Sequence, residues 1–128
     1  MQILIDFKRQ SEAKLRGEFR THTDSILRAV TLDFAFWLYC NYHIVLVVTC
    51  LCRDKEENRS VGGSPTSRHL ETICKAVDYR TRGWPEEAVT AAEKYIEDTW
   101  SDLVWVLVEK THIHLQLSRK SFPQGSLK

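Results

Sequence analysis

The apolar stretch over residues 32–51 constrains the fold more than any other part of this 128-residue sequence. A membrane span needs about 20 predominantly apolar residues, but Asp33, Asn41 and His43 interrupt the stretch. Its hydrophobic period also changes midway, from helical spacing to a dense run of Val, Ile and Leu. We therefore expect a buried helix followed by a strand buried on both faces, and no integral membrane segment.

The helix should begin at a capping residue, Thr23 or Asp24, and run to about Tyr42. Its apolar residues recur at helical spacing: Ile26, Leu27, Val30, Phe34, Trp37 and Leu38. The strand should follow over residues 43–51. We place Trp37, Trp100 and Trp105 in the hydrophobic core.

The remaining pattern predicts strands over residues 75–80, 103–108 and 112–117, with a turn or bulge between the last two. A helix should start after Gly83 and end near Trp100, because Pro85 and two glutamates suit a first turn. Residues 2–7 form either a short strand or an arm. This order predicts an α+β domain with a small, mostly antiparallel β-sheet and flanking helices.

Length and composition indicate one domain. Hydrophobic residues make up 43% and charged residues 27% of the chain, which is typical of a globular protein. The net charge of +1 provides no strong field for nucleic acid, so no nucleic-acid partner is expected. We expect a monomer with a single domain over residues 1–128: an N-terminal arm over 1–20, a core over 43–117 and a polar tail over 118–128.

The four cysteines, Cys40, Cys50, Cys52 and Cys74, allow three pairings. The N-terminal residues lack the basic region, long apolar run and cleavage site of a signal peptide. We therefore expect reduced thiols in a protein that is cytoplasmic as synthesised. Cysteine ligands for a structural zinc are the less favoured alternative to small buried side chains.

The sharpest local feature is the pair His112 and His114. Residues i and i+2 of a strand point to the same side, and neutral imidazole is a good zinc ligand. The alternative is a pair of histidines on a solvated sheet face.

Three further residues favour a metal site over that alternative. His69 ends a long glycine-containing loop and Asp78 lies in the next expected strand. A catalytic zinc usually takes three protein ligands and leaves a position for water. His69, Asp78 and one histidine of the pair would supply that set, with Glu109 as a general base for the water.

Three blocks of sequence resemble the zinc D-alanyl-D-alanine metallopeptidases, a family that includes lytic endopeptidases of phages and the fold of hedgehog signalling domains. The first block is VTCLCR at 48–53 followed by NRSVGGSPTSRHL at 58–70, similar to the family's strand ending in an arginine, loop and Ser-x-His motif. The second, AVD at 76–78, is similar to its Ala-x-Asp. The third, WVLVEKTHIH at 105–114, is similar to its Glu followed by His-x-His.

The resemblance implies a role for each matching residue. His69, Asp78 and His114 match the zinc ligands, and Glu109 matches the carboxylate that activates the water. His112 would stabilise the tetrahedral intermediate. Some members instead use Glu-x-x-His with that histidine as ligand, which makes His112 the rival third ligand.

Two more matches concern the substrate, and two departures concern the metal. Arg53 matches an arginine that polarises the scissile carbonyl or anchors the substrate, and Ser67 matches the small polar residue that supports the ligand loop. Eight residues, rather than the family's usual six, separate His69 from Asp78, and Cys74 replaces the usual glycine. A bulge before the strand would absorb the insertion; without one, the metal site would be lost.

The resemblance implies a zinc-dependent hydrolase, a metallopeptidase whose partner is a stem or cross-bridge peptide of peptidoglycan. It would act as a carboxypeptidase or an endopeptidase in cell wall degradation, at the wall and after phage-driven lysis in the case of a phage endolysin. The alternative is a catalytically inactive, zinc-stabilised binding or virion-associated module of the same fold. Such a module has no need of Glu109 or Arg53 beside the metal.

Overall fold

The computed structural model describes residues 4–51 and 73–118. The elements follow in the order β1 (Ile5–Phe7), the 3₁₀ turn η1 (Arg9–Ser11), α1 (Glu12–Thr21), α2 (Ser25–Tyr42), β2 (Leu46–Cys50), β3 (Ala76–Arg80), α4 (Glu86–Trp100), β4 (Val104–Val108) and β5 (His112–Leu117). The strands form one sheet in the order β1-β2-β3-β5-β4, antiparallel except for the parallel pair β1 and β2. This confirms the expected α+β fold with a mostly antiparallel sheet.

Both ends of α2 follow from local chemistry. The side chain of Asp24 accepts a hydrogen bond of 2.8 Å from the backbone N–H of Ile26, which confirms the predicted cap. His43 ends the helix in the left-handed conformation, with φ of 56°. Because His43 is part of that helix end, β2 begins only at Leu46.

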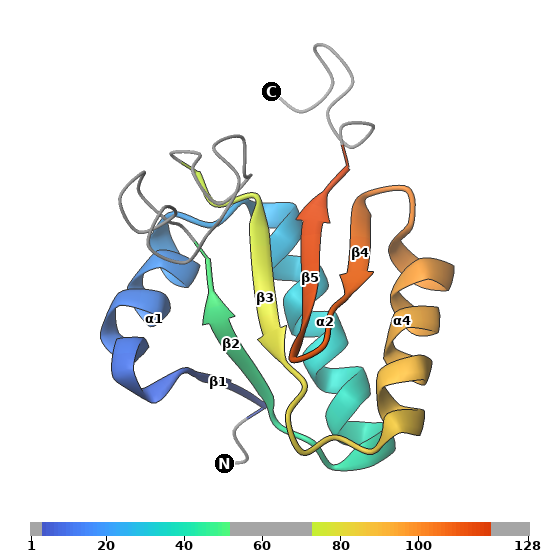
Figure 1. Cartoon of the computed structure of the whole chain (residues 1–128). Coiled ribbons are helices and arrows are strands. Elements are labelled where there is room, and N and C mark those ends of the chain that lie inside the picture. Colours follow the sequence, from blue (N-terminus) through green and yellow to red (C-terminus); the bar gives the residue numbers. More distant parts are fainter. Residues whose placement is uncertain (1–3, 52–72, 119–128) are drawn as a thin grey trace.

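Helices α2 and α4 pack against the same side of the sheet; in Figure 1, α2 lies behind the strands and α4 stands beside β4. The core between the two layers is formed by fully buried side chains of α2 and of the strands: Leu27, Val30, Phe34, Leu38, Val48, Val77, Tyr79, Ile113 and Leu115. Helix α4 contributes Ala88, Ala92 and Ile96, two of which are small enough for the helix to approach the sheet closely. We call this side of the sheet the helix face, and the other side the open face.

Asp33, which interrupts the apolar stretch, joins the two helices. Its Oδ2 atom accepts hydrogen bonds from the Tyr95 hydroxyl at 2.6 Å and from Nε1 of Trp100 at 2.9 Å. Two α4 side chains thus satisfy one α2 carboxylate beside the core. Trp37 and Trp100 pack against the core, as expected.

Helix α1 was not predicted. It buries Leu15 and Phe19 against the β1 side of the sheet, where the rings of Phe19 and Phe7 are 5.9 Å apart. Two exposed ion pairs at i,i+4 spacing, Glu12–Arg16 and Lys14–Glu18, support the helix.

The expectations for the burial of β2 and for the cysteines are wrong. Strand β2 is buried on one face only, because Leu46 and Val48 are inaccessible while Val47 and Thr49 are half-buried. Cys74 is disulfide-bonded, whereas Cys40 and Cys50 do not take part in a disulfide. A disulfide depends on how far apart two Cα atoms lie in the folded chain, and linear spacing does not contain that distance.

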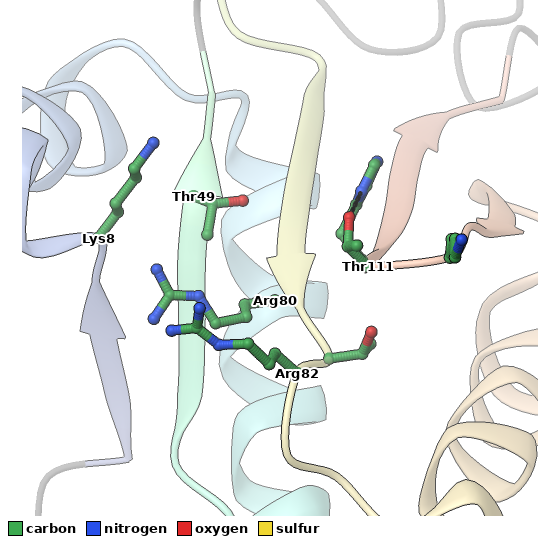
Figure 2. A pocket seen from close by; sticks show the side chains of 8 residues that line it. Lys8, Thr49, Arg80, Arg82 and Thr111 are labelled. Atoms are coloured by element: carbon green, nitrogen blue, oxygen red, sulfur yellow. Dashed lines mark hydrogen bonds between the residues drawn. The ribbon is translucent and has the colours of Figure 1, made fainter.

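The open face is hollowed beside the β4–β5 turn. A pocket of about 370 Å³ lies there, and Figure 2 shows its lining. The described residues that line it are Lys8, Thr49, Arg80, Thr81, Arg82, Lys110, Thr111 and His112. Separately, none of the helices in the described ranges is long and apolar enough to cross a membrane.

Candidate active site

The alternation of β5 places its polar side chains on the open face. Ile113, Leu115 and Leu117 are buried on the helix face, while His112, His114 and Gln116 are half-buried on the other. On the neighbouring strand, Asp78 lies directly opposite His114 in the antiparallel register. The predicted strand geometry of the His-x-His pair is therefore confirmed, and it brings His114 to Asp78.

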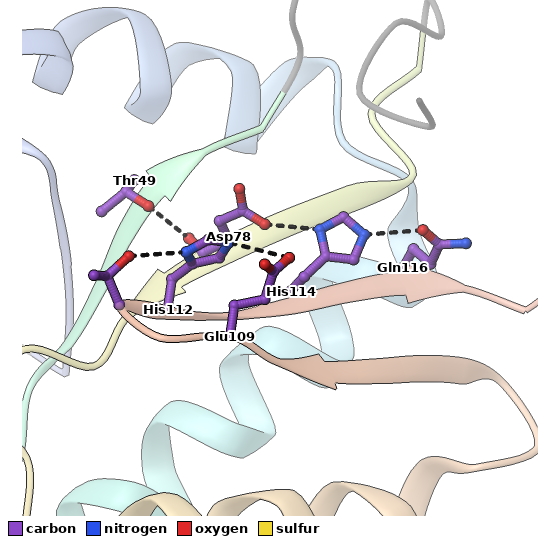
Figure 3. Close-up of polar contacts among 7 residues, drawn as sticks. Thr49, Asp78, Glu109, His112, His114 and Gln116 are labelled. Atoms are coloured by element: carbon purple, nitrogen blue, oxygen red, sulfur yellow. Dashed lines mark hydrogen bonds and ion pairs between the residues drawn. The ribbon is translucent and has the colours of Figure 1, made fainter. Parts of the chain in front are cut away.

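His114 is held between two oxygen atoms, as Figure 3 shows. Its Nδ1–H donates to Oδ1 of Asp78 at 2.8 Å, and its Nε2 atom lies 2.9 Å from Oε1 of Gln116. Asp78 and His114 retain only 14% and 15% of their side-chain exposure. The pair is shielded enough for its interactions to be stronger than those of a surface ion pair.

Burial by itself lowers the pKa of His114, because it disfavours the charged imidazolium. The hydrogen bonds to Asp78 and Gln116 and the negative charges of Asp78 and Glu109 outweigh it, so the pKa of His114 is raised above its ordinary value. Figure 3 shows the Glu109 side chain on the same face of the sheet as this pair.

Glu109 and His112 lie where β4 turns into β5. The turn is closed by a backbone hydrogen bond of 2.8 Å from N–H of Glu109 to the carbonyl of His112, which confirms the predicted turn. Nε2 of His112 lies 3.7 Å from Oε1 of Glu109, and its Nδ1 lies 3.2 Å from the hydroxyl of Thr111. Glu109 is half-exposed, so its carboxylate is accessible to water and to a ligand.

Arg53, Ser67 and His69 lie outside the described residues. The structure does show where the segment that contains them leaves the sheet. Cys50, the last residue of β2, is paired with Asp78 in the ladder. Strand β2 therefore ends beside Asp78.

The donor atoms of Asp78 and His114 fit a zinc ion. Two ligands of a tetrahedral zinc, each about 2.0–2.2 Å from the metal, lie about 3.3 Å apart. The hydrogen-bonded oxygen of Asp78 and nitrogen of His114 are 2.8 Å apart. A zinc ion would fit between them if the shared proton were lost and the two atoms moved about 0.5 Å further apart. Among residues 4–51 and 73–118, no three His, Cys, Asp or Glu side chains group closely enough to hold a metal ion. A zinc site on this pair needs a further ligand from elsewhere in the chain.

Two residues of this region were not predicted. Gln116 contacts His114, and the ring of Trp105 meets the His114 imidazole edge-on, with centroids 6.2 Å apart. Trp105 is 49% exposed, so its expected place in the core is wrong. The period-2 alternation of β4 was the available signal, because Val104 and Val106 occupy the helix face and leave Trp105 on the open face.

The described part of the chain thus has a carboxylate–imidazole pair on the open face of an α+β sheet, with a second carboxylate and imidazole at the adjoining turn. In a comparison with known proteins, the family model described as Peptidase M15 matches residues 8–116. The match covers most of the chain, and the chain therefore belongs to the Peptidase M15 family, consistent with the resemblance to D-alanyl-D-alanine metallopeptidases. Family membership supports a peptidase, a hydrolase of the metallopeptidase kind. No curated protein and no solved structure matches the chain.

Proposed function

We propose that this protein is a zinc-dependent peptidase that hydrolyses stem or cross-bridge peptides of peptidoglycan, as a carboxypeptidase or an endopeptidase. The observation that carries the proposal is the contact of Asp78 with His114 beside Glu109, in a chain of the Peptidase M15 family. A phage or bacterial origin, and action at the cell wall in the manner of an endolysin, belong to the same proposal.

In this proposal Asp78 and His114 hold the zinc together with His69. When bound, zinc lowers the pKa of a coordinated water and polarises a carbonyl. His114 is preferred to His112 as the third ligand because it contacts Asp78, whereas His112 lies opposite Arg80 in the ladder.

The other residues act on water and substrate. The Glu109 carboxylate takes a proton from the attacking water and delivers it to the leaving amine. His112, 3.7 Å from Glu109, stabilises the developing oxyanion. Arg53 anchors the substrate or polarises its carbonyl, and Ser67 supports the segment that carries His69.

The first test measures zinc content and hydrolysis of muropeptides in the same preparations. We expect about one zinc per chain, lost on His69→Ala, Asp78→Ala or His114→Ala and retained on His112→Ala. Loss of zinc on His112→Ala with retention on His114→Ala would exchange the roles of the two histidines. A protein that takes up no zinc after reconstitution would contradict the proposal.

Glu109→Gln should lower the rate about 100- to 10,000-fold while zinc stays bound, because the variant lacks a general base. Glu97→Gln, at an exposed position of α4, is the matched control and should retain full activity. Full activity of Glu109→Gln would remove the proposed catalytic role. A zinc-loaded wild-type protein that cleaves no muropeptide would favour the inactive binding module instead.

A further inference from the structure

The open-face pocket is strongly basic. Four of the described residues that line it carry a permanent positive charge, Lys8, Arg80, Arg82 and Lys110, and none carries a negative charge. Within the described ranges, none of the four is ion-paired with a carboxylate. The whole chain has a net charge of only +1, so this is a local concentration of charge.

This cluster of positive charges lies next to the candidate catalytic residues. Arg80 faces His112 across the β3–β5 ladder, and Lys110 directly follows Glu109 in the turn. Figure 2 shows Arg80 and Arg82 extending from the end of β3 toward β2, on the side where Thr49 lies. His112 itself lines the pocket, and its Nε2 atom lies 3.7 Å from Oε1 of Glu109, so a ligand in the pocket would lie beside both residues.

The side chains that line the pocket indicate which kind of ligand it would bind. A guanidinium group presents a planar fork of N–H donors that matches a carboxylate, and an ammonium adds a point charge. The hydroxyls of Thr49 and Thr111 add neutral donors. Like charges held together repel one another, and an oxyanion between them removes that repulsion.

We propose that this pocket binds a free carboxylate of the peptide substrate beside the scissile bond, through Arg80, Arg82, Lys8 and Lys110. The inference rests on the proposed function, because it gives the peptidase a preference for acidic peptides. It adds an anion subsite built on β3 and the β4–β5 turn to the substrate contact expected of Arg53.

Arg82 and Lys110 are the residues to change. Both are exposed, and their side chains make no hydrogen bond or ion pair with described residues. Arg80 also borders a second pocket that contains Asp6 and Glu12, so its replacement would alter two environments. Arg20→Gln, which removes an exposed positive charge from α1 outside the pocket, is the matched control.

The probes are two synthetic peptides that contain an internal D-glutamate and end in D-alanyl-D-alanine. One has free carboxylates, and in the other every carboxylate is a carboxamide. Binding is measured calorimetrically to the full chain carrying Glu109→Gln, so that the peptide is not consumed. We expect the carboxylate peptide to bind about ten-fold or more tightly than the carboxamide, as charge-assisted hydrogen bonds imply.

Arg82→Gln and Lys110→Gln should each remove most of that preference, and Arg20→Gln should leave it intact. Inorganic phosphate should displace the carboxylate peptide, since it offers the same oxyanion chemistry. Equal binding of the two peptides, or equal losses on Arg82→Gln and Arg20→Gln, would overturn the proposal.

Hydrolysis by the wild-type protein separates this inference from the proposed function. Cleavage of both peptides at equal rates, unchanged in Arg82→Gln, would reject the subsite and keep the peptidase. Binding that depends on Arg82, without cleavage of either peptide, would keep the anion pocket and reject the peptidase.

Discussion

The two faces of the sheet are built by the same strands and differ in almost everything else. On β5, Ile113 and Leu115 have no accessible surface, while the interleaved His112 and His114 reach the open face. On β3, Tyr79 is buried under α2, while Asp78 contacts His114. Burial stabilises the fold from one side of the sheet, which leaves the other side free to carry charges and imidazoles. Changes on the helix face should therefore act on stability, and changes on the open face on chemistry.

The largest effect on folding should come from Leu115→Ala. Removing this buried side chain leaves a cavity between the sheet and α2, and should lower the free energy of unfolding by about 2–5 kcal/mol. Urea denaturation of the two proteins measures the change. Leu107→Ala, on the open face of β4 and 40% exposed, is the control and should cost about 1 kcal/mol or less. Equal losses would contradict the division between the faces.

A smaller effect on the free energy of unfolding is expected when the hydrogen bond between β3 and α2 is removed. The hydroxyls of Tyr79 and Thr31 lie 2.6 Å apart in the core. Tyr79→Phe leaves the Thr31 hydroxyl buried without its partner, which should cost about 1–3 kcal/mol. Adding Thr31→Val should recover part of that loss, because no polar group then stays unsatisfied. Tyr39→Phe, at a partly exposed position of α2, should change the free energy of unfolding by less than about 0.5 kcal/mol.

The smallest effect is a pH dependence that originates on the open face. In the metal-free protein the raised pKa of His114 means that its ion pair with Asp78 stabilises the fold. This stabilisation is fully present below the unfolded-state pKa, about 6.5, and is lost as the pH rises through the higher folded-state pKa. Urea denaturation in the presence of a chelator, from pH 5 to pH 9, should show the loss.

His114→Gln should remove this pH-dependent component, and His22→Gln, at an exposed histidine, should retain it. Zinc should reverse the trend, because a ligand must be deprotonated to bind and metal affinity therefore rises with pH. An identical pH profile in wild type and His114→Gln would show that the Asp78–His114 pair does not stabilise the metal-free fold.

Sequence reasoning predicted the elements that local patterns specify. Asp24 as a cap, the helix from Gly83 to Trp100 and the turn after Glu109 follow from side chains within a few residues of each feature. It missed α1, because Leu15 and Phe19 are a short apolar signal in a charged segment. It placed Trp105 in the core because hydrophobicity alone does not say which face of a strand is covered.

In the candidate site, too, one part of the geometry follows from the sequence and another part only from the tertiary structure. That His112 and His114 point to one side of a strand was determined by the sequence alone, since side chains alternate along any extended chain. That Asp78 meets His114, 36 residues away, was decided by the tertiary structure. The register between β3 and β5 is fixed by the apolar residues on their helix face, Val77, Tyr79, Ile113 and Leu115. A slip of β5 by one residue against β3 would move Ile113 and Leu115 to the open face and expose them to water. The buried face thus sets the geometry of the open one.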